Sequence, residues 1–179
     1  MKANKNLLIP VAAVAGLLII NACKIGIPKG AKPVTHFNAS KYLGKWFEIA
    51  RFDYIFEKGL EQCTAEYSTN ADGSIQVVNR GFKPKTNQWK ESRGEAKFID
   101  EENVGRLKVS FFKPFWAGYN VISVDDDYKY ALVAGNSRKY LWILSRTTEI
   151  PEDIKEKYLK TAKELGYNTD KLIWTRHRR

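Results

Sequence analysis

The chain is poor in the residue types that most enzymes use for catalysis and metal binding. Its 179 residues include 2 cysteines, 2 histidines and 1 methionine, and the two histidines, His36 and His177, are far apart in the sequence. No group of histidines and cysteines has the spacing of a metal site. The sequence also lacks a nucleophile-elbow serine motif, a phosphate-binding loop and a dinucleotide-binding glycine motif. We therefore expect no catalytic residues, no metal and no cofactor.

Aromatic residues, by contrast, are abundant, because 5 Trp, 9 Tyr and 9 Phe make up 13% of the chain. Large aromatic side chains are favoured in strands and in the walls of apolar pockets. A β protein with a cavity and a β protein with a solid aromatic core both fit this composition. The length predicts a single domain.

The formal net charge is +10, which suits an anionic membrane or a nucleic acid as partner. The basic residues are scattered along the chain, except for Arg176-His177-Arg178-Arg179 at its end. We therefore expect no nucleic-acid partner. The basic tail is expected to be a frayed, solvated end.

The first segment of the chain has the features of a secretory signal. Lys2 and Lys5 precede 14 uncharged residues, Leu7 to Ile20, which is shorter than the about 20 residues that span a bilayer and matches the about 7–15 of a signal-peptide core. The run ends at Ile20-Asn21-Ala22-Cys23, which resembles a bacterial lipobox. An ordinary signal peptide with an incidental cysteine is the alternative.

The lipobox resemblance implies how the chain is divided and where it lies. Residues 1–22 would be removed, and Cys23 would carry acyl chains, of which two or more make a stable membrane anchor. Residues 23–35, rich in Gly, Pro and Lys, are expected to form a flexible tether, and residues 36–179 the folded domain. Because Lys24 rather than aspartate follows the cysteine, the resemblance implies the periplasmic side of the bacterial outer membrane.

The rest of the sequence reads as many short strands separated by turn residues. Asp72-Gly73 lies between two strand patterns and is a strong hairpin signal. A helix is expected from Pro151 to a glycine cap at Gly166, followed by a short strand over residues 171–174. The pattern predicts eight strands, over residues 46–52, 63–68, 75–82, 89–98, 106–112, 118–124, 130–134 and 140–146.

This pattern predicts an all-β fold, either an up-and-down barrel or a sandwich, with the C-terminal helix packed outside. Three sequence blocks favour the barrel, because together they resemble the lipocalin family, and a fourth, Leu107 to Phe112, resembles its bacterial branch specifically. The three blocks are Gly44-Lys45-Trp46 with Glu48-Ile49-Ala50-Arg51, Tyr119 to Val133, and Trp142-Ile143-Leu144-Ser145-Arg146.

The resemblance extends from about Pro33 to Trp174 and implies an eight-stranded antiparallel up-and-down barrel. Gly44, Trp46 and Arg146 would form its structural signature. The indole of Trp46 would close one end of the barrel and the guanidinium of Arg146 would lie over its face, a contact worth about 0.5–2 kcal/mol.

Strand alternation then predicts which side chains face the interior. Trp46 should share its side with Glu48 and Ala50, and Cys63 should share its side with Tyr67. The expected ligand-binding residues are Glu48, Tyr67, Val77, Asn79, Val109, Phe111, Tyr119, Trp142 and Leu144. For Tyr67, Asn79, Tyr119 and Trp142 the resemblance supports the assignment.

Two of these expectations leave alternatives open. The Glu48 carboxylate either contacts the ligand or is hydrogen-bonded within the barrel. Phe52, Tyr54 and Phe56 either form a lid over the cavity mouth or pack against their own loop.

An apolar pocket with a few polar groups suits an amphiphile with one polar head. The sequence therefore predicts a membrane-anchored protein that binds fatty acids or lysophospholipids, for lipid storage or transport in outer-membrane maintenance or repair. One alternative is a lipocalin-fold enzyme of the isomerase type that uses Cys63. Another is a structural lipoprotein with a filled barrel. The bacterial relatives also leave a homodimer open.

Overall fold

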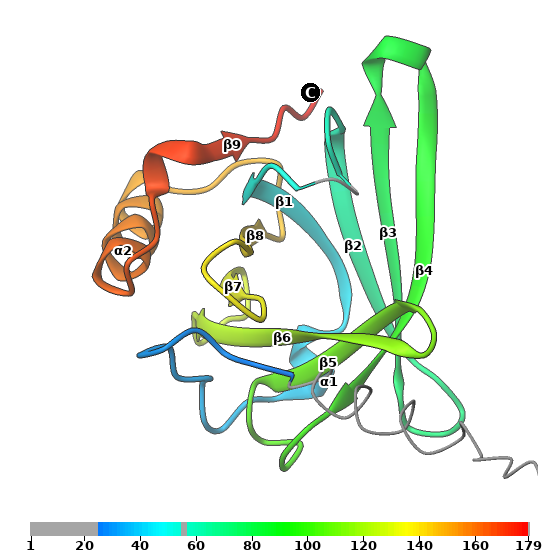
Figure 1. Cartoon of the computed structure of the whole chain (residues 1–179), viewed down its shortest axis with the longest axis vertical. Coiled ribbons are helices and arrows are strands. Elements are labelled where there is room, and N and C mark those ends of the chain that lie inside the picture. The colour runs from blue at the N-terminus through cyan, green and yellow to red at the C-terminus, as the bar shows by residue number, and fades with distance from the viewer. Residues whose placement is uncertain (1–24, 55–56, 179) are drawn as a thin grey trace, which may run out of the picture.

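The computed structural model describes residues 25–54 and 57–178, which form one curved antiparallel sheet with a helix outside it (Figure 1). The signal segment, Cys23 and Phe56 lie outside these residues. The strands are β1 (Gly44–Phe52), β2 (Glu61–Thr69), β3 (Ile75–Lys83), β4 (Gln88–Phe98), β5 (Arg106–Phe112), β6 (Phe115–Val124), β7 (Tyr130–Ala134), β8 (Leu141–Ser145) and β9 (Leu172–Trp174). The helices are α1 (Ala39–Tyr42), α2 (Glu152–Glu164), η2 (Pro84–Thr86) and η3 (Thr169–Lys171).

Strands β1 to β8 pair in chain order, and β8 returns to β1. The first half of β1 also pairs with β2, which closes the barrel, while its second half pairs with β9. Closure removes the free strand edges that promote aggregation. The predicted up-and-down barrel is therefore confirmed, and β5 and β7 span the predicted ranges.

One end of the barrel is closed by the predicted pair of Trp46 and Arg146. Trp46 is fully buried, and the Arg146 guanidinium lies 3.9 Å from the centre of its ring. The indole nitrogen donates to the Tyr42 carbonyl oxygen at 2.8 Å. Gly44 has a φ of +88° and passes beside the guanidinium, a conformation that favours glycine.

The predicted side assignment along β1 is wrong after Glu48, because a bulge interrupts the strand. The pairing of β1 with β8 shifts between Glu48 and Ala50, so the alternation reverses there. Ile49 and Ala50 consequently pack outside the barrel with Tyr158 and Ala162 of α2. Arg51, the next residue, is turned to the Glu48 side instead and is almost completely buried.

The predicted C-terminal helix packs on the outer wall and ends as expected. Gly166 follows α2 with a φ of +82°, and its amide donates to the carbonyl oxygen of Lys163 at 2.9 Å. Within the described part of the chain, no helix is long and apolar enough to cross a bilayer.

The basic tail is not a frayed end over the described residues, which corrects the expectation. The Thr175 amide donates to the Ile49 carbonyl oxygen at 2.9 Å, and the Arg176 carbonyl oxygen accepts from Gln62 at 2.8 Å. The His177 ring nitrogen lies 2.8 Å from the Glu48 carbonyl oxygen. The tail therefore fills the space between β1 and β2 where these two strands diverge.

The segment predicted to be a flexible tether also packs against the barrel. Ala31 is buried, and the Val34 amide donates to the Val121 carbonyl oxygen at 2.9 Å. Thr35 forms a bridge with Val104. Residues 25–35 therefore run along the outer wall, and the glycines and prolines there do not make a free linker.

Candidate ligand cavity

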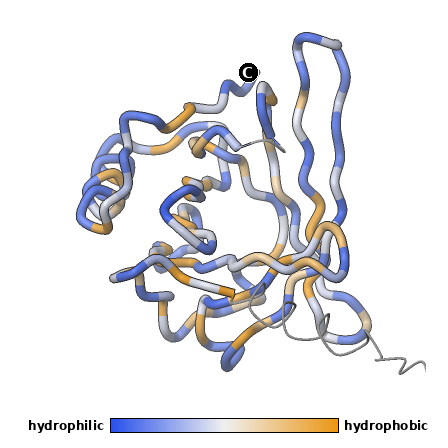
Figure 2. Tube along the Cα trace, viewed as in Figure 1, coloured by the Kyte–Doolittle hydropathy of each residue, from blue (hydrophilic) through white to orange (hydrophobic). Residues whose placement is uncertain are grey.

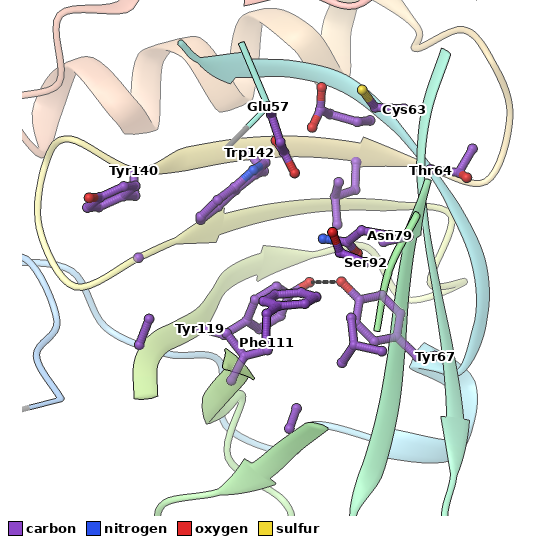
Figure 3. A pocket seen from close by; sticks show the side chains of 18 of the residues that line it. Glu57, Cys63, Thr64, Tyr67, Asn79, Ser92, Phe111, Tyr119, Tyr140 and Trp142 are labelled. Carbon is purple, nitrogen blue, oxygen red and sulfur yellow. Dashed lines mark hydrogen bonds between the residues drawn. The ribbon is translucent and has the colours of Figure 1, made fainter. Parts of the chain in front are cut away.

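The barrel encloses a cavity of about 710 Å³, within the range of small-molecule binding sites. All nine residues predicted to bind the ligand border it, from Glu48 on β1 to Leu144 on β8. Figure 3 shows several of them pointing into the same space from opposite walls of the barrel. The interior is therefore hollow, as strand alternation and eight-strand closure together predict.

A cluster of three tyrosines lies toward the closed end of the cavity. The Tyr119 hydroxyl forms hydrogen bonds of 2.7 Å with the Tyr42 hydroxyl and 2.8 Å with the Tyr67 hydroxyl, the latter drawn in Figure 3. Burial raises the pKa of Tyr67 and of Tyr119 above the ordinary phenol value. These hydroxyls are therefore neutral and already paired, so this region presents an apolar surface with hydrogen bonds satisfied internally.

The middle of the cavity is apolar, with one unpaired polar atom. Val77 and Leu144 are buried in its wall, and Val109 packs against the same core. The buried side-chain oxygen of Asn79 has no hydrogen-bond partner among the described residues. An unpaired buried acceptor in an apolar wall is a favourable contact point for a donor on a ligand or for a bound water.

A charged cluster centred on Arg51 borders the cavity toward its open end. The Arg51 guanidinium is 1% exposed and is hydrogen-bonded to the Glu48 carboxylate. It also donates to the Thr175 hydroxyl at 3.1 Å and to the carbonyl oxygens of Glu57 at 2.7 Å and Leu60 at 3.2 Å. The Glu48 carboxylate is therefore hydrogen-bonded within the barrel, which is one of the two alternatives that the sequence left open for it.

Sequence reasoning missed Arg51 as a site residue. It belongs to the run that follows Trp46, but simple alternation from Trp46 turns it outward. The signal that was available is the pair Ile49-Ala50, two apolar residues in succession, which is compatible with a bulge that puts both on the helix-covered side.

Glu57 is the second carboxyl of this cluster and faces the cavity (Figure 3). Burial, reinforced by the negative charge of Glu48, raises the pKa of Glu57 to about 8. Its carboxylate lies 3.6 Å from the Arg51 Nε. Glu57 is therefore largely protonated near neutral pH, which leaves Arg51 and Glu48 as the balanced pair of charges.

Cys63, the alternative nucleophile, is buried beside this cluster and is a free thiol. Burial raises the pKa of Cys63 well above its ordinary value, and the charge of Glu48 raises it further. The thiolate is the reactive form of cysteine. The surroundings therefore suppress the nucleophile that an isomerase mechanism needs.

Of the two alternatives for Phe52, Tyr54 and Phe56, a lid or packing within their own loop, neither describes both Phe52 and Tyr54. Tyr54 lies at the cavity wall, where its hydroxyl accepts from the Trp142 ring nitrogen at 3.3 Å, and its ring packs edge-on against Tyr140 and Trp142. Phe52 is not a lid residue, because its ring stacks on Tyr167 outside the barrel at 6.0 Å.

Among residues 25–54 and 57–178, no three histidine, cysteine, aspartate or glutamate side chains are arranged to hold a metal ion. The groups that face the cavity are an apolar wall, neutral tyrosines, the unpaired Asn79 oxygen, the cluster around Arg51 and further charged side chains that include Lys58 and Lys83. This arrangement is suited to holding a mainly apolar molecule.

A family model described as a lipocalin-like domain matches residues 37–177. The chain belongs to the lipocalin family. Its relatives include the outer membrane lipoprotein Blc of Citrobacter freundii, which is 47% identical over 93% of this chain and 94% of its own length. The protein of the same name from Vibrio cholerae is 45% identical over 88% of this chain and 92% of its own.

The chain is also similar to a more distant relative and to solved structures. Temperature-induced lipocalin-1 of Arabidopsis thaliana is 35% identical over 80% of this chain and 81% of its own length. Among solved structures, insecticyanin of the tobacco hornworm Manduca sexta superposes with a TM-score of 0.70 at 21% identity, over 86% of this chain and 88% of its own. At that identity the likeness shows the barrel alone.

Proposed function

We propose that this lipocalin holds a single fatty acid or lysophospholipid in its barrel, for storage or transport of lipid in outer-membrane maintenance. The observation that carries the proposal is the cavity of about 710 Å³, closed at one end by Trp46 and lined mainly by apolar side chains. Its size and chemistry suit one amphiphile, and the thiol that borders it, Cys63, is held in its unreactive form.

Burial of the acyl chain supplies the driving force. Each methylene removed from water contributes about 0.8 kcal/mol, so a sixteen-carbon tail contributes about 10 kcal/mol before the costs of association. The tail would lie along Val77 and Leu144 toward the tyrosine cluster. Lys58, Lys83 and Lys90 also border the cavity and would face an anionic head group.

The proposed location rests on the N-terminal motif and on the relatives. Two of them are named outer membrane lipoproteins and match nearly the whole of this chain. We propose that residues 1–22 are a signal peptide, that Cys23 is acylated, and that the barrel is anchored on the periplasmic side of the outer membrane. The dual-acyl anchor of such a lipoprotein is effectively stable.

Native mass spectrometry of the full chain, extracted from membranes in mild detergent, tests the lipid proposal. The expected result is one adduct per chain, with the mass of a fatty acid or lysophospholipid. Val77→Trp and Val109→Trp place an indole inside the cavity and should each abolish the adduct. Gln76→Trp, which adds the same group outside the cavity lining, should keep it.

The proposal is wrong if the folded wild-type chain carries no lipid and takes up none from added lysophospholipid. It is also wrong if the two cavity-filling variants, shown to be folded by circular dichroism, bind lipid as well as Gln76→Trp does. In either case the space inside the barrel would not be the lipid site.

A further inference from the structure

The turn between β5 and β6 carries an exposed aromatic cluster that packing within the barrel does not explain. Four aromatic residues, Phe111, Phe112, Phe115 and Trp116, flank Lys113 and Pro114, and we call residues 111–116 the aromatic turn. Phe112 is 76% exposed and Phe115 65%, the two most exposed large hydrophobic side chains of the described residues. Their rings stack at 6.5 Å. Exposed apolar clusters of this kind mark interaction sites.

The aromatic turn borders the open end of the cavity. All four aromatic side chains belong to the cavity lining, and Figure 3 labels Phe111 among the side chains that line it. The neighbouring β3–β4 hairpin extends farther from the barrel and is mostly hydrophilic (Figures 1 and 2). The two most exposed large hydrophobic side chains of the described residues therefore lie together on the β5–β6 turn, whereas Trp89 of the β3–β4 hairpin, 59% exposed, packs against Phe82.

The start of the described chain lies beside the same turn. The Gly26 carbonyl oxygen accepts from the Asn120 side-chain nitrogen of β6 at 3.5 Å. The same oxygen lies so close to Gly118 that a Cβ at position 118 would be only 2.6 Å away from it. Gly118 is three residues from Phe115 along β6.

This position leaves the anchoring cysteine little freedom. Cys23 precedes Gly26 by three residues, which span at most about 10 Å when fully extended. Because residues 25–35 pack on the barrel, they add no slack to this reach. The acyl chains proposed on Cys23 would therefore enter the membrane close to the aromatic turn.

We propose that the aromatic turn is a second membrane contact, which inserts into the interfacial layer of the leaflet that holds the acylated Cys23. The inference rests on the anchor of the proposed function. Aromatic rings favour the membrane interface, and Lys113, 68% exposed at the tip, would meet lipid phosphates while it also pairs with Glu95 at 2.5 Å. The cavity mouth then opens onto the bilayer, so a lipid tail reaches the barrel interior without crossing water.

The burial of Cys63 allows a direct test by cysteine labelling. Full-length protein carrying Lys113→Cys is labelled with a polarity-sensitive fluorophore, since Cys63 is buried and Cys23 is acylated. A matched chain carries the label at Glu156→Cys on the exposed face of α2. Both are reconstituted in vesicles of phosphatidylethanolamine and phosphatidylglycerol in a three-to-one ratio, and a nitroxide attached to the lipid serves as quencher. We expect quenching at position 113 to be at least about threefold stronger than at position 156.

Two double variants show whether the aromatic side chains cause the contact. Phe112→Ser with Phe115→Ser should reduce quenching at position 113 to the level of position 156. Ile173→Ser with Trp174→Ser, which removes an exposed apolar pair on β9, should leave it unchanged. Equal quenching at 113 and 156 in the unaltered chain overturns the proposal.

A second copy of the chain is the competing occupant of the aromatic turn. The acyl-free Cys23→Ser chain, labelled at position 113, tests this in the absence of lipid. If the label is shielded and the chain sediments as a dimer, the aromatic turn binds a second copy and the membrane proposal is wrong. The mass of the peptide that contains Cys23 shows whether this cysteine is acylated. The lipid adduct in native mass spectrometry shows whether the cavity binds lipid. Loss of either one therefore contradicts the proposed function, whereas the quenching ratio tests the aromatic turn alone.

Discussion

The two ends of this barrel are each organised around an arginine, but the partners of the two arginines differ. At the closed end Arg146 lies over the Trp46 ring and donates to the carbonyl oxygens of Lys45 at 2.8 Å and Leu43 at 2.9 Å. At the open end Arg51 is bonded to the carboxylate of Glu48 and lies near that of Glu57.

The difference separates a permanent structure from a titratable one. Carbonyl oxygens and an indole do not change charge with pH, so these partners of Arg146 do not titrate. Carboxylates do change charge, and Arg51 is 1% exposed, so its cluster depends on the balance between buried charges. The floor of the cavity is thus fixed, while the region near its mouth responds to protons.

The largest effect is expected from Arg51→Met. This change leaves the Glu48 carboxylate buried without its cation, which costs about 3–5 kcal/mol of unfolding free energy. Urea unfolding at pH 7 measures it. Arg80→Met is the matched control, because Arg80 pairs with Glu91 at 2.7 Å on the surface with both side chains well exposed, and solvent screening leaves such a pair with little effect on stability. Equal losses in the two variants would contradict the contrast between a buried and a solvated ion pair.

Arg146→Ala comes next, with an expected loss of about 3 kcal/mol. The change removes the cation over the indole and several charged hydrogen bonds to carbonyl oxygens. Arg146→Lys keeps the charge and should lose about half as much, because an ammonium cannot stack and donate in several directions at once. If lysine restored full stability in urea unfolding, charge alone would explain the contact.

The pH dependence of stability should arise at the open end. The folded-state pKa of Glu57, about 8, lies above its ordinary value of 4.5. The native state therefore holds this proton more tightly than the unfolded state does. Its stabilising contribution is complete below about pH 4.5 and is lost as the pH rises toward 8, with a slope of at most about 1.4 kcal/mol per pH unit.

Glu57→Gln tests this assignment, because glutamine imitates the protonated carboxyl at every pH. Unfolding free energies at pH 5.5 and pH 8 should differ less in the variant than in the wild-type chain. An unchanged difference between the two pH values would assign the titration to another group.

The smallest effect is expected in the tyrosine cluster. Tyr119→Phe removes the central hydroxyl and leaves Tyr42 and Tyr67 each without its partner, which should cost about 1–2 kcal/mol. Tyr67→Phe breaks one of these bonds and should cost about half as much. Thermal unfolding followed by circular dichroism compares the two, and an equal or smaller loss for Tyr119→Phe would contradict the pairing described.

Local sequence patterns predicted most of the fold and of the cavity wall. Alternation along β3, β5 and β8 correctly placed Val77, Val109 and Leu144, because these strands are regular there and one face of each is buried. The Asp72-Gly73 turn and the C-terminal helix that ends before Gly166 were also predicted correctly, because both depend on the backbone preferences of single residues.

The errors have a common physical cause, which is pairing between distant segments. The β1 bulge depends on how Glu48 and Ala50 meet β8. The basic tail and the segment before His36 are held by backbone hydrogen bonds to β1, β2 and β6. Backbone pairing does not depend on the charge or glycine content of a segment. Composition therefore predicted that the basic tail and the N-terminal segment are free, whereas both pack against the barrel.

The most direct test of the central claim places a lipid tail beside a known wall residue. A fatty acid brominated near the head-group end of its chain, where the tail would pass Trp142, is titrated against the wild-type protein and against Trp142→Phe, with tryptophan emission as the readout. We predict saturable quenching at one fatty acid per chain, most of it lost in the variant, because Trp142 lines the cavity. Quenching that does not saturate, or that is unchanged in Trp142→Phe, would show that the tail does not enter the barrel.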